Sequence, residues 1–430
     1  MSMTLEEKIK GRTAQVGILG LGYVGLPLAV EFAKAGYRVT GLDVSESKVA
    51  QINNGLSYIR DVPTDELGPL VSEGKLRATT DFTALAGLDT VNVCVPTPLR
   101  KTKDPDMSFV VDACRAIADH LHPGMLIILE STTYPGTTDE LVLPMLQRDN
   151  LEVGRDFFLC FSPERVDPGN PKFQTVNIPK VVGGTTAACT RMGALFYRQA
   201  LETVVTVSST QVAEMVKLLE NTFRMINIGL VNEIAMMCDR MSIDVWEVVE
   251  AAATKPFGFM PFHPGPGLGG HCIPVDPFYL SWKSKQAGIE ARFIELAGHI
   301  NGGMPQFVVD KVQGALNNVS KPVRGSRIHV SGVAYKRNID DVRESPALDI
   351  LRLLVKRGAE VSYSDPYVPC LQLDGLRLRS DDAARSQADC VVIVTDHSDV
   401  DYRQILDQAP LVVDTRNVLR GVNSPKLVRL

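Results

Sequence analysis

The chain has 430 residues, of which 45% are hydrophobic and 22% charged, and its net charge is -5. These values are typical of an ordinary globular protein with two or three domains, and they favour neither a nucleic-acid partner nor a membrane partner. Met1 to Gly11 contain no apolar core of a signal peptide, and the eight cysteines are dispersed without a C-x-x-C pair, so a cytoplasmic protein is predicted.

Strand and helix patterns alternate along the first two hundred residues, as they do in a doubly wound sheet. A short buried strand is predicted over Gln15–Leu19, a helix over Leu26–Ala35 and a second strand over Tyr37–Asp43. Further buried strands are predicted over Asp89–Val95, Met125–Leu129 and Phe157–Phe161.

The alternating pattern of strands and helices ends near Ser208. Thr210–Met241 contains no proline and has apolar residues at helical spacing, which predicts one long helix between domains and a possible dimer surface. The segment Gly258–Gly270 is dense in glycine and proline, so it is expected to form a shaped loop.

The alternation of strands and helices resumes after this loop. The predicted elements are Arg327–Val333, Glu360–Ser364, Asp389–Thr395 and Leu411–Asp414 as strands and Ser345–Lys356 as a helix. The predicted fold class is therefore α/β, with two Rossmann-like doubly wound domains joined by a long central helix and a helical region. The expected boundaries are 1–207, 208–318 and 319–430.

The run Gly20-Leu-Gly22-Tyr23-Val24-Gly25 has the form G-x-G-x-x-G. It follows a predicted strand, opens a predicted helix and precedes Asp43, which ends the next strand. Glycines in this arrangement let a pyrophosphate approach the backbone at the positive end of a helix, and the acidic residue binds ribose hydroxyls. Because Asp43 would repel a 2′-phosphate, NAD rather than NADP is the predicted cofactor.

Cys272 lies in a run rich in glycine, with Gly265, Gly267, Gly269 and Gly270 before it and Asp276 after it. Such a thiol can hold an aldehyde as a covalent adduct while a nicotinamide cofactor accepts hydride. The alternative is a buried structural cysteine. The neighbouring His271 is expected to have a structural or substrate-contact role, and no histidine spacing predicts a metal site.

Two further groups have both a functional and an ordinary interpretation. Lys217 and Asn221 are one helical turn apart, and they form either a solvated face or part of a cleft. Glu164 follows a predicted strand and is either a general base or the ion-pair partner of Arg165. Thr97 and Thr132 also follow predicted strands.

These motifs occur in the order seen in the UDP-sugar 6-dehydrogenases, which the chain resembles from about residue 14 to residue 418. The motifs are the glycine fingerprint, Val95-Pro-Thr-Pro, Ser131-Thr-Thr-Tyr-Pro-Gly, Ser162-Pro-Glu-Arg, Lys217-x-x-x-Asn221, Gly269-Gly-His-Cys-Ile-Pro-Val-Asp276 and the run from Gly332 to Pro346. The resemblance implies an NAD-dependent, four-electron oxidation of a sugar C6 alcohol to a carboxylate.

The resemblance also implies roles for the site residues. Cys272 would be the nucleophile that forms a thiohemiacetal and then a thioester, and Lys217 would stabilise the oxyanion. Asp276, Glu164 and Thr132 would position or activate water, with Glu164 the expected base. The remaining cofactor contacts would include Lys48, Thr97, Thr132 and Arg343. The substrate contacts would be Glu164, Arg165, Lys217, Asn221, Gly267, Gly269, Gly270, Lys336, Arg416 and, from a neighbouring subunit, Arg240.

In the family, the last domain binds UDP, the central region makes a homodimer, and the product serves polysaccharide synthesis. Val275 stands where UDP-glucose dehydrogenases have a lysine, so the chain resembles the branch acting on UDP-N-acetylhexosamines, especially UDP-N-acetylglucosamine. UDP-N-acetylmannosamine and UDP-glucose are alternative substrates. Two other classes are a nucleotide-sugar-binding protein without catalysis and a 3-hydroxyacid or 6-phosphogluconate type of dehydrogenase, which has no use for the cysteine loop.

Overall fold

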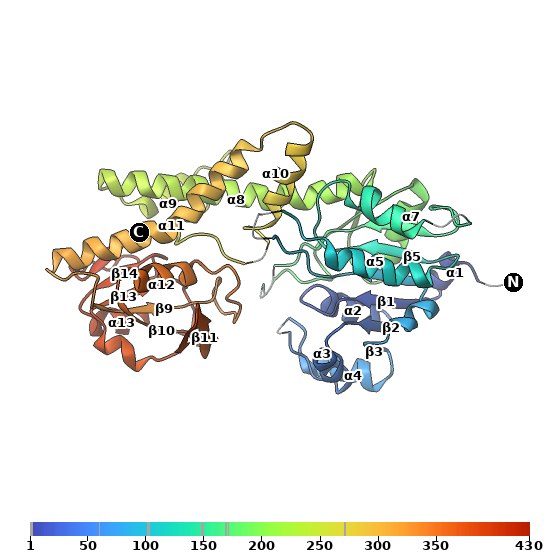
Figure 1. The fold of residues 1–430 in the computed structure, drawn as a ribbon, viewed down its shortest axis with the longest axis horizontal. Coiled ribbons are helices and arrows are strands. Elements are labelled where there is room, and N and C mark those ends of the chain that lie inside the picture. The colour runs from blue at the N-terminus through green and yellow to red at the C-terminus, as the bar shows by residue number, and fades with distance from the viewer. Residues whose placement is uncertain are drawn as a thin grey trace. The chain divides into compact units, whose positions relative to one another are not determined.

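The computed structural model describes residues 3–59, 61–100, 104–147, 150–167, 170, 172–270 and 272–430 (Figure 1). The chain divides into two compact units. The first comprises Met1–Glu220 with Trp282–Ala287, and the second comprises Asn221–Ser281 with Gly288–Leu430. Each unit is described by itself.

The first unit contains an eight-stranded sheet in the order β3-β2-β1-β4-β5-β6-β7-β8. Strands β1 to β6 are parallel, and β7 reverses direction against β6. The strands are β1 (Gln15–Leu19), β2 (Arg38–Leu42), β3 (Leu76–Thr79), β4 (Thr90–Val93), β5 (Leu126–Leu129), β6 (Phe158–Phe161), β7 (Lys180–Gly184) and β8 (Val204–Thr206).

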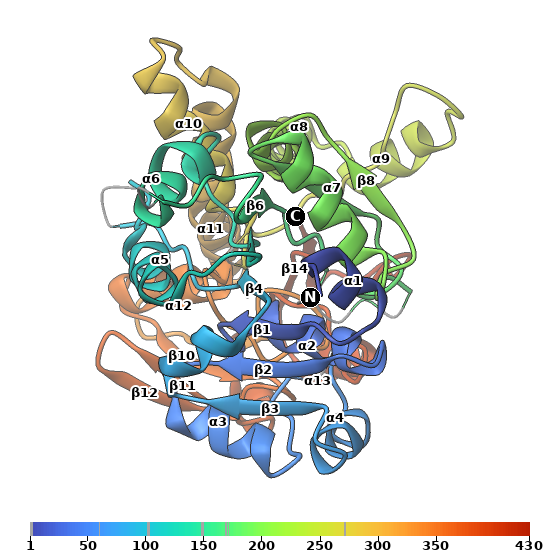
Figure 2. The same ribbon diagram turned by 90° about the vertical axis from the view of Figure 1, so that its right-hand side faces the viewer.

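Two hydrophobic clusters cover the two faces of this sheet. Val16 and Ile18 of β1 pack toward one side, whereas Val91 and Val93 of β4 pack toward the other. Figure 2 shows α5 and α7 on opposite sides of β4 and β6. The helices are α1 (Leu5–Lys10), α2 (Gly25–Lys34), α3 (Glu46–Asn53), α4 (Thr64–Ser72), α5 (Ser108–His120), α6 (Leu143–Leu146) and α7 (Ala187–Tyr197), with short turns η1 (Phe82–Gly87) and η2 (Thr138–Val142).

Long helices dominate the middle of the chain. Helix α8 (Thr210–Met241) is continuous across the boundary between the units. It is followed by α9 (Val245–Ala253), α10 (Asp276–Gln286) and α11 (Arg292–Asn318). Asp244 caps α9 by accepting the N–H groups of Trp246 and Glu247.

The second unit contains a five-stranded parallel sheet in the order β10-β9-β13-β14-β15. Alternate residues of β13 enter two clusters, with Val392 packing toward α11 and α12 and Val391 toward α13. The elements are β9 (Arg327–Ser331), α12 (Pro346–Lys356), β10 (Glu360–Ser364), β11 (Cys370–Leu373), β12 (Leu376–Arg379), η3 (Ala383–Gln387), β13 (Cys390–Ile393), α13 (Tyr402–Gln408), β14 (Val412–Asp414) and β15 (Leu427–Arg429). Strands β11 and β12 form a separate antiparallel hairpin.

The predicted fold class is confirmed, with two doubly wound α/β sheets and a long helical region between them in the sequence. The helix predicted over Thr210–Met241 has these bounds in the structure. Several predicted strands are shorter by one or two residues at their ends. Among the helices of the described residues, none is long and apolar enough to span a membrane.

Candidate active site

The glycine fingerprint forms the turn between β1 and α2. Gly20 has φ +94°, and a Cβ there would lie 2.5 Å from the Cys94 carbonyl oxygen, whereas a Cβ on Gly25 would collide with the Gly20 carbonyl oxygen. A Cβ on Gly22 would meet no atom of the described residues within 4 Å. Among the residues that the structure describes, no side chain caps the first turn of α2, which begins at Gly25 next to Val24 and the exposed Tyr23. The turn therefore leaves open space at a helix N-terminus, which fits a bound pyrophosphate.

Asp43 lies directly beyond β2 and is buried next to this turn. Its Oδ2 accepts the N–H of Leu21 at 2.9 Å and a hydrogen bond from Lys48 Nζ at 3.2 Å, and its Oδ1 accepts the N–H of Ser45 at 2.9 Å. The structure thus brings together the turn, Asp43 and Lys48. This fits the predicted ribose contact, since Oδ1 has a second lone pair beyond the one that the Ser45 N–H uses.

The loops after β4 and β5, which carry Thr97 and Thr132, are tied to each other. Ser131 Oγ donates to the Val95 carbonyl oxygen at 2.8 Å. Farther along the loop after β5, Glu214 of α8 accepts three hydrogen bonds. They come from the Gly136 N–H at 2.6 Å, the Thr138 N–H at 2.9 Å and the Thr138 hydroxyl at 2.7 Å. This loop is therefore fixed to α8 less than one turn before Lys217.

Glu214 is also a buried acid. Burial raises the pKa of Glu214 to about 7, against the lowering effect of its hydrogen bonds to Thr138 and Gly136. The contact between α8 and the loop after β5 thus contains a carboxyl group that titrates near neutrality.

Glu164 follows β6 and contacts Lys180, the first residue of β7. Glu164 Oε1 accepts the N–H groups of Arg165 and Val166 at 2.6 and 2.8 Å, and Oε2 accepts from Lys180 Nζ at 3.0 Å. Burial raises the pKa of Glu164, but the Lys180 ammonium and the N–H groups of Val166 and Arg165 together outweigh it, so the net pKa lies below the ordinary value. Glu164 is therefore an ionised carboxylate, which a general base must be.

The ion pair between Glu164 and Arg165, the alternative interpretation from sequence, is not formed. Arg165 Nη2 instead lies 2.7 Å from Glu220 Oε1 on α8, and its Nη1 donates to the Pro179 carbonyl oxygen at 2.6 Å. Arg165 thus holds the segment after β6 against α8 and the start of β7.

Lys217 and Asn221 of α8 do not form a solvated face. Their exposed fractions are 8% and 4%, so the alternative in which both side chains point into water is wrong. Lys217 belongs to the first unit and Asn221 to the second.

Within the second unit, Cys272, Asp276 and Asn221 are in one place. Cys272 is half-buried in the turn that starts α10, and its carbonyl oxygen accepts the Asp276 N–H at 2.8 Å. Asn221 Nδ2 donates to Asp276 Oδ2 at 2.5 Å. Asn221 of one sequence motif therefore meets Cys272 and Asp276 of another at the N-terminus of a helix. His271, the residue before Cys272, lies outside the described residues.

A chain of carboxamides holds the glycine-rich loop before Cys272. The Gly265 N–H donates to Asn232 Oδ1 at 3.0 Å, Asn232 Nδ2 donates to Asn301 Oδ1 at 2.9 Å, and Asn301 Nδ2 donates to the Met225 carbonyl oxygen at 3.1 Å. Asn232 and Asn301 are both buried. We call these three hydrogen bonds the carboxamide clamp.

The same loop lies against the segment that carries Lys336 and Arg343. Gly270 has φ +83° and donates its N–H to the Arg343 carbonyl oxygen at 3.1 Å. A Cβ on Gly269 would lie 2.5 Å from the Tyr335 Cβ, so the two segments are in close contact. On its other side, Gly267 faces the Asn301 carbonyl oxygen and Pro346.

Arg416 approaches this loop near Gly265, since a Cβ on that glycine would be 2.9 Å from Arg416 Nη1. Arg416 Nε donates to the Val394 carbonyl oxygen at 2.8 Å. Burial and, to a smaller extent, the charge of Arg337 lower the pKa of Arg416 to about 10. Arg416 therefore keeps its charge at neutral pH. Arg240, the predicted neighbour contact, lies exposed in the last turn of α8.

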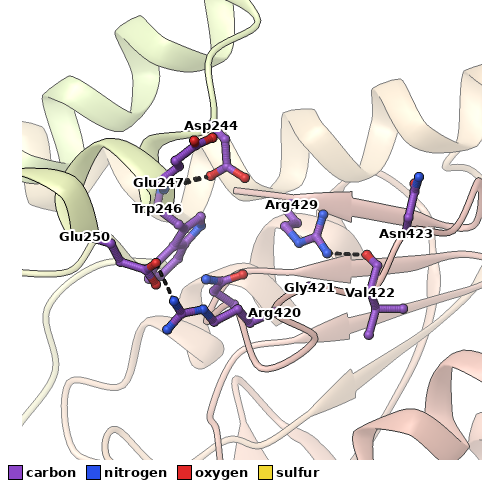
Figure 3. Close-up of a pocket in the computed structure, with 10 residues that line it drawn as sticks. Asp244, Trp246, Glu247, Glu250, Arg420, Gly421, Val422, Asn423 and Arg429 are labelled. Carbon is purple, nitrogen blue, oxygen red and sulfur yellow. Dashed lines mark hydrogen bonds and ion pairs between the residues drawn. The ribbon is translucent and has the colours of Figure 1, made fainter.

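A cavity of about 350 Å³ lies elsewhere in the second unit (Figure 3). It is bordered by α9, with Asp244, Trp246 and Glu250, and by residues near the end of the chain, including Arg420 and Arg429. None of its lining residues is among the predicted site residues. Within the described part of the chain, no cluster of three or more histidine, cysteine, aspartate or glutamate residues could hold a metal ion.

Sequence reasoning did not identify several residues that hold the site. Glu130 precedes the Ser131 motif, Lys180 begins an otherwise apolar strand, and Glu214 lies on the helix of Lys217. In each case a charged residue within an apolar run was the available signal. For Asn232 and Asn301 the signal was weaker, because it consisted only of an amide side chain at a helix position whose spacing predicts burial.

Three family models match consecutive parts of the chain. They are the NAD binding domain, the central domain and the UDP binding domain of the UDP-glucose/GDP-mannose dehydrogenase family, at residues 14–201, 211–302 and 329–421.

Three named proteins are similar to the chain along most of its length. UDP-N-acetyl-D-mannosamine dehydrogenase from Pyrococcus horikoshii is 35% identical over 94% of this chain and 96% of its own. NDP-N-acetyl-D-galactosaminuronic acid dehydrogenase from Ralstonia nicotianae is 36% identical over the same shares. UDP-N-acetyl-D-glucosamine 6-dehydrogenase from Pseudomonas aeruginosa is 37% identical over 82% of this chain and 83% of its own. A solved structure of a UDP-D-ManNAc dehydrogenase from P. horikoshii matches with a TM-score of 0.87 at 33% identity, covering 96% of this chain and 98% of that one.

Proposed function

The chain belongs to the UDP-glucose/GDP-mannose dehydrogenase family, and we propose that it oxidises the C6 alcohol of a UDP-N-acetylhexosamine to a carboxylate in two NAD-dependent steps. It is an NAD-dependent enzyme of the UDP-sugar dehydrogenase class. The proposal concerns the two-step course, the sugar and the residues that act.

One observation carries the proposal. Cys272, Asp276 and Asn221 meet at the start of α10, where the Asn221 amide holds the Asp276 carboxylate and the Asp276 N–H holds the Cys272 carbonyl group. A thiol at a helix N-terminus is in the environment that favours a reactive thiolate. A purely structural cysteine would need neither a buried carboxylate nor a buried amide beside it.

Cys272 is assigned as the nucleophile. Its thiolate attacks the C6 aldehyde that the first oxidation produces, which gives a thiohemiacetal, and the second oxidation converts this adduct into a thioester. Water then attacks the thioester carbonyl carbon, the carbon–sulfur bond breaks, and the acid leaves. We assign Lys217 to the oxyanion, Glu164 to the proton of the water, and Asp276, Asn221 and Thr132 to the orientation of the reacting groups.

The turn at Gly22, with Asp43, Lys48, Thr97 and Thr132, would hold NAD, and Arg343 is assigned a further contact. NAD, when bound, accepts a hydride in each oxidation. The open space at Gly22 and the uncapped start of α2 support this assignment.

The substrate would be held by the clamped glycine loop of the second unit. Gly267, Gly269 and Gly270 offer backbone groups, and Arg416 offers a charged guanidinium that suits a diphosphate. We assign Lys336 and Arg165 to the substrate as well.

The relatives are named for different sugars. The P. aeruginosa relative is named for UDP-N-acetyl-D-glucosamine, and Val275 in the cysteine motif points to the same branch. The P. horikoshii relative is named for UDP-N-acetyl-D-mannosamine, which makes that sugar the second candidate. We put UDP-N-acetylglucosamine first.

We also propose that the protein is a homodimer formed along α8, with Arg240 reaching the neighbouring substrate site. An apolar stripe runs down the exposed side of α8 at spacings of three, four or seven residues. The stripe consists of Val212, Met215, Leu219, Phe223, Leu230, Met237 and Met241. A stripe of this length is characteristic of helix pairing.

We keep the functional division 1–207 for NAD binding, 208–318 for the central region with the cysteine loop, and 319–430 for UDP binding. A cytoplasmic role in supplying a uronic acid for polysaccharides fits these assignments.

The test supplies purified protein with NAD and, separately, UDP-N-acetylglucosamine, UDP-N-acetylgalactosamine, UDP-N-acetylmannosamine and UDP-glucose, and records NADH and product mass. Two NADH per sugar and an acid product from an N-acetyl sugar support the proposal. Cys272→Ser should fail to complete the acid product. Cys370→Ser, which alters an exposed cysteine of β11, should form the acid at the wild-type rate. Tight UDP-sugar binding without NADH from any substrate would refute the proposal.

A further inference from the structure

A buried charged network lies at the ends of strands β4, β5 and β6. Glu130, directly after β5, receives hydrogen bonds on Oε1 from Asn92 Nδ2 at 2.8 Å and from the Tyr197 hydroxyl, and on Oε2 from Lys180 Nζ at 2.5 Å. Lys180 also donates to Glu164 Oε2 at 3.0 Å. Lys180 therefore bridges two carboxylates that come from different strand ends.

This bridge exists because β7 runs antiparallel to β6. The reversal places the first residue of β7, Lys180, at the edge of the sheet where β5 and β6 end. In open α/β sheets this edge is where ligands bind. The topology thus delivers a cation to the side chain that we assign as the base.

Water does not screen these charges. The exposed fractions of the Lys180, Glu130 and Glu164 side chains are 5%, 0% and 12%. With both carboxyl groups ionised, the two carboxylates and one ammonium leave an excess of one negative charge. Such a buried cluster is weak evidence for a purely stabilising role, since apolar residues of similar size are often as stable. Burial raises the pKa of Glu130, while the Lys180 ammonium lowers that of Glu164.

We propose that Lys180 is a positioning residue that keeps Glu164 ionised and oriented as the acceptor of the water proton, with Glu130 anchoring Lys180. The inference rests on the proposed function, because it assigns Glu164 its task in thioester hydrolysis. Lys180 acts through Glu164 and does not itself contact the reacting atoms.

The step balances as follows. Water oxygen forms a bond to the thioester carbonyl carbon, and one water proton passes to a Glu164 carboxylate oxygen. The carbon–sulfur bond breaks and its electron pair leaves on the Cys272 sulfur as a thiolate. The acid product carries the remaining O–H, and Glu164 returns its proton to solvent before the next turnover.

Within the described residues, titratable and charged groups from several elements of the first unit form the electrostatic environment of Glu164. They are Lys180 from β7, Glu130 after β5, Cys94 after β4, Tyr197 from α7, Glu220 from α8 and the adjacent Arg165. Among them, Lys180 and Glu130 have opposite charges and are hydrogen-bonded to each other. Replacing Lys180 and replacing Glu130 should therefore shift the pKa of Glu164 in opposite directions.

The experiment measures acid formation from UDP-N-acetylglucosamine and NAD as a function of pH, or from whichever sugar the wild type oxidises. Lys180→Met should move the acidic limb of the profile upward by about one pH unit or more, because a buried carboxylate without its cation binds a proton more tightly. Glu130→Gln should move the limb downward, because a competing negative charge is removed. Lys34→Met is the matched control, since Lys34 bridges Glu31 and Glu66 at 3.1 and 2.6 Å on the surface, and it should not move the limb.

The outcomes separate the inference from the function on which it rests. If the wild type forms no acid, both the proposed function and the role of Lys180 are overturned. If Glu164→Gln forms acid at the wild-type rate, the role of Glu164 falls and the inference with it. If the wild type forms acid and Glu164→Gln does not, but the limb stays in place in Lys180→Met and Glu130→Gln, the inference alone is overturned. Should Lys180→Met fail to fold, the nearly isosteric Glu130→Gln decides by the direction of its shift.

Discussion

Replacing glycines of the fingerprint one at a time should separate cofactor binding from folding. In Gly22→Ala the new methyl group meets nothing within 4 Å, and the Gly22 backbone is not in the left-handed region. The folded state should therefore keep its stability or gain up to about 1 kcal/mol, since alanine loses less entropy than glycine on folding. The methyl group would occupy the approach of the pyrophosphate, so we expect at least about a tenfold loss of NAD affinity, or about 1.4 kcal/mol.

Gly20→Ala, in contrast, should destabilise the folded state. Its φ of +94° costs an alanine about 1–2 kcal/mol. Its Cβ would lie 2.5 Å from the Cys94 carbonyl oxygen, 0.9 Å closer than the 3.4 Å at which ordinary contacts begin. Overpacking of this kind adds about 1–3 kcal/mol, so the free energy of unfolding should fall by about 2–5 kcal/mol.

Urea unfolding and calorimetric titration with NAD measure the two effects separately. Gly74→Ala is a control for backbone strain alone, because Gly74 has φ +68° and open space around its Cβ, and it should cost about 1–2 kcal/mol without changing NAD affinity. Wild-type NAD affinity in a folded Gly22→Ala protein would refute the placement of the pyrophosphate at this turn.

Two further predictions concern stability and assembly. Burial lowers the pKa of His329, whose ring nitrogens contact the hydroxyls of Ser362 and Ser364, from 6.5 to about 4. The folded state therefore binds fewer protons than the unfolded state between these values, and about 3 kcal/mol of stability, present above pH 6.5, should be lost as the pH falls to 4. Urea titrations across this range should show the slope in the wild type and lack it in His329→Phe, and an equal slope in both would contradict the assignment. In sedimentation experiments Leu219→Lys combined with Leu230→Lys should yield monomers, whereas Leu376→Lys on β12 should not, and an unchanged oligomer in the double variant would exclude α8 as the interface.

The parts of the fold that follow from local chemistry were predictable. The helix Thr210–Met241 is marked by thirty-two residues without proline, and the turn at Gly20 is marked by glycine spacing that few other structures need. The residues near Cys272 were predictable in kind, because glycines, a thiol and a carboxylate in one run suit covalent chemistry.

What could not be predicted depends on strand direction and on contacts between distant residues. Nothing in the sequence around Lys180 indicates that β7 reverses, because a short apolar strand reads the same in both directions. Arg165 was the one ion-pair partner that the sequence suggested for Glu164, beside the interpretation as a general base, whereas the ion pair runs to a lysine sixteen residues away. The buried hydrogen bond from Asn232 to Asn301 likewise joins two helices that only the folded chain brings together.

The carboxamide clamp has a consequence for how the enzyme responds to its surroundings. Its hydrogen bonds join amide groups and backbone groups, none of which gains or loses a proton in the range where enzymes work. The anchor of the glycine-rich loop at Gly265 should then be indifferent to acidity and to added salt. Carboxylates elsewhere, such as Glu214 and Glu164, are left to sense the proton concentration, so the anchor of the loop at Gly265 and these titrating groups are separate parts of the molecule.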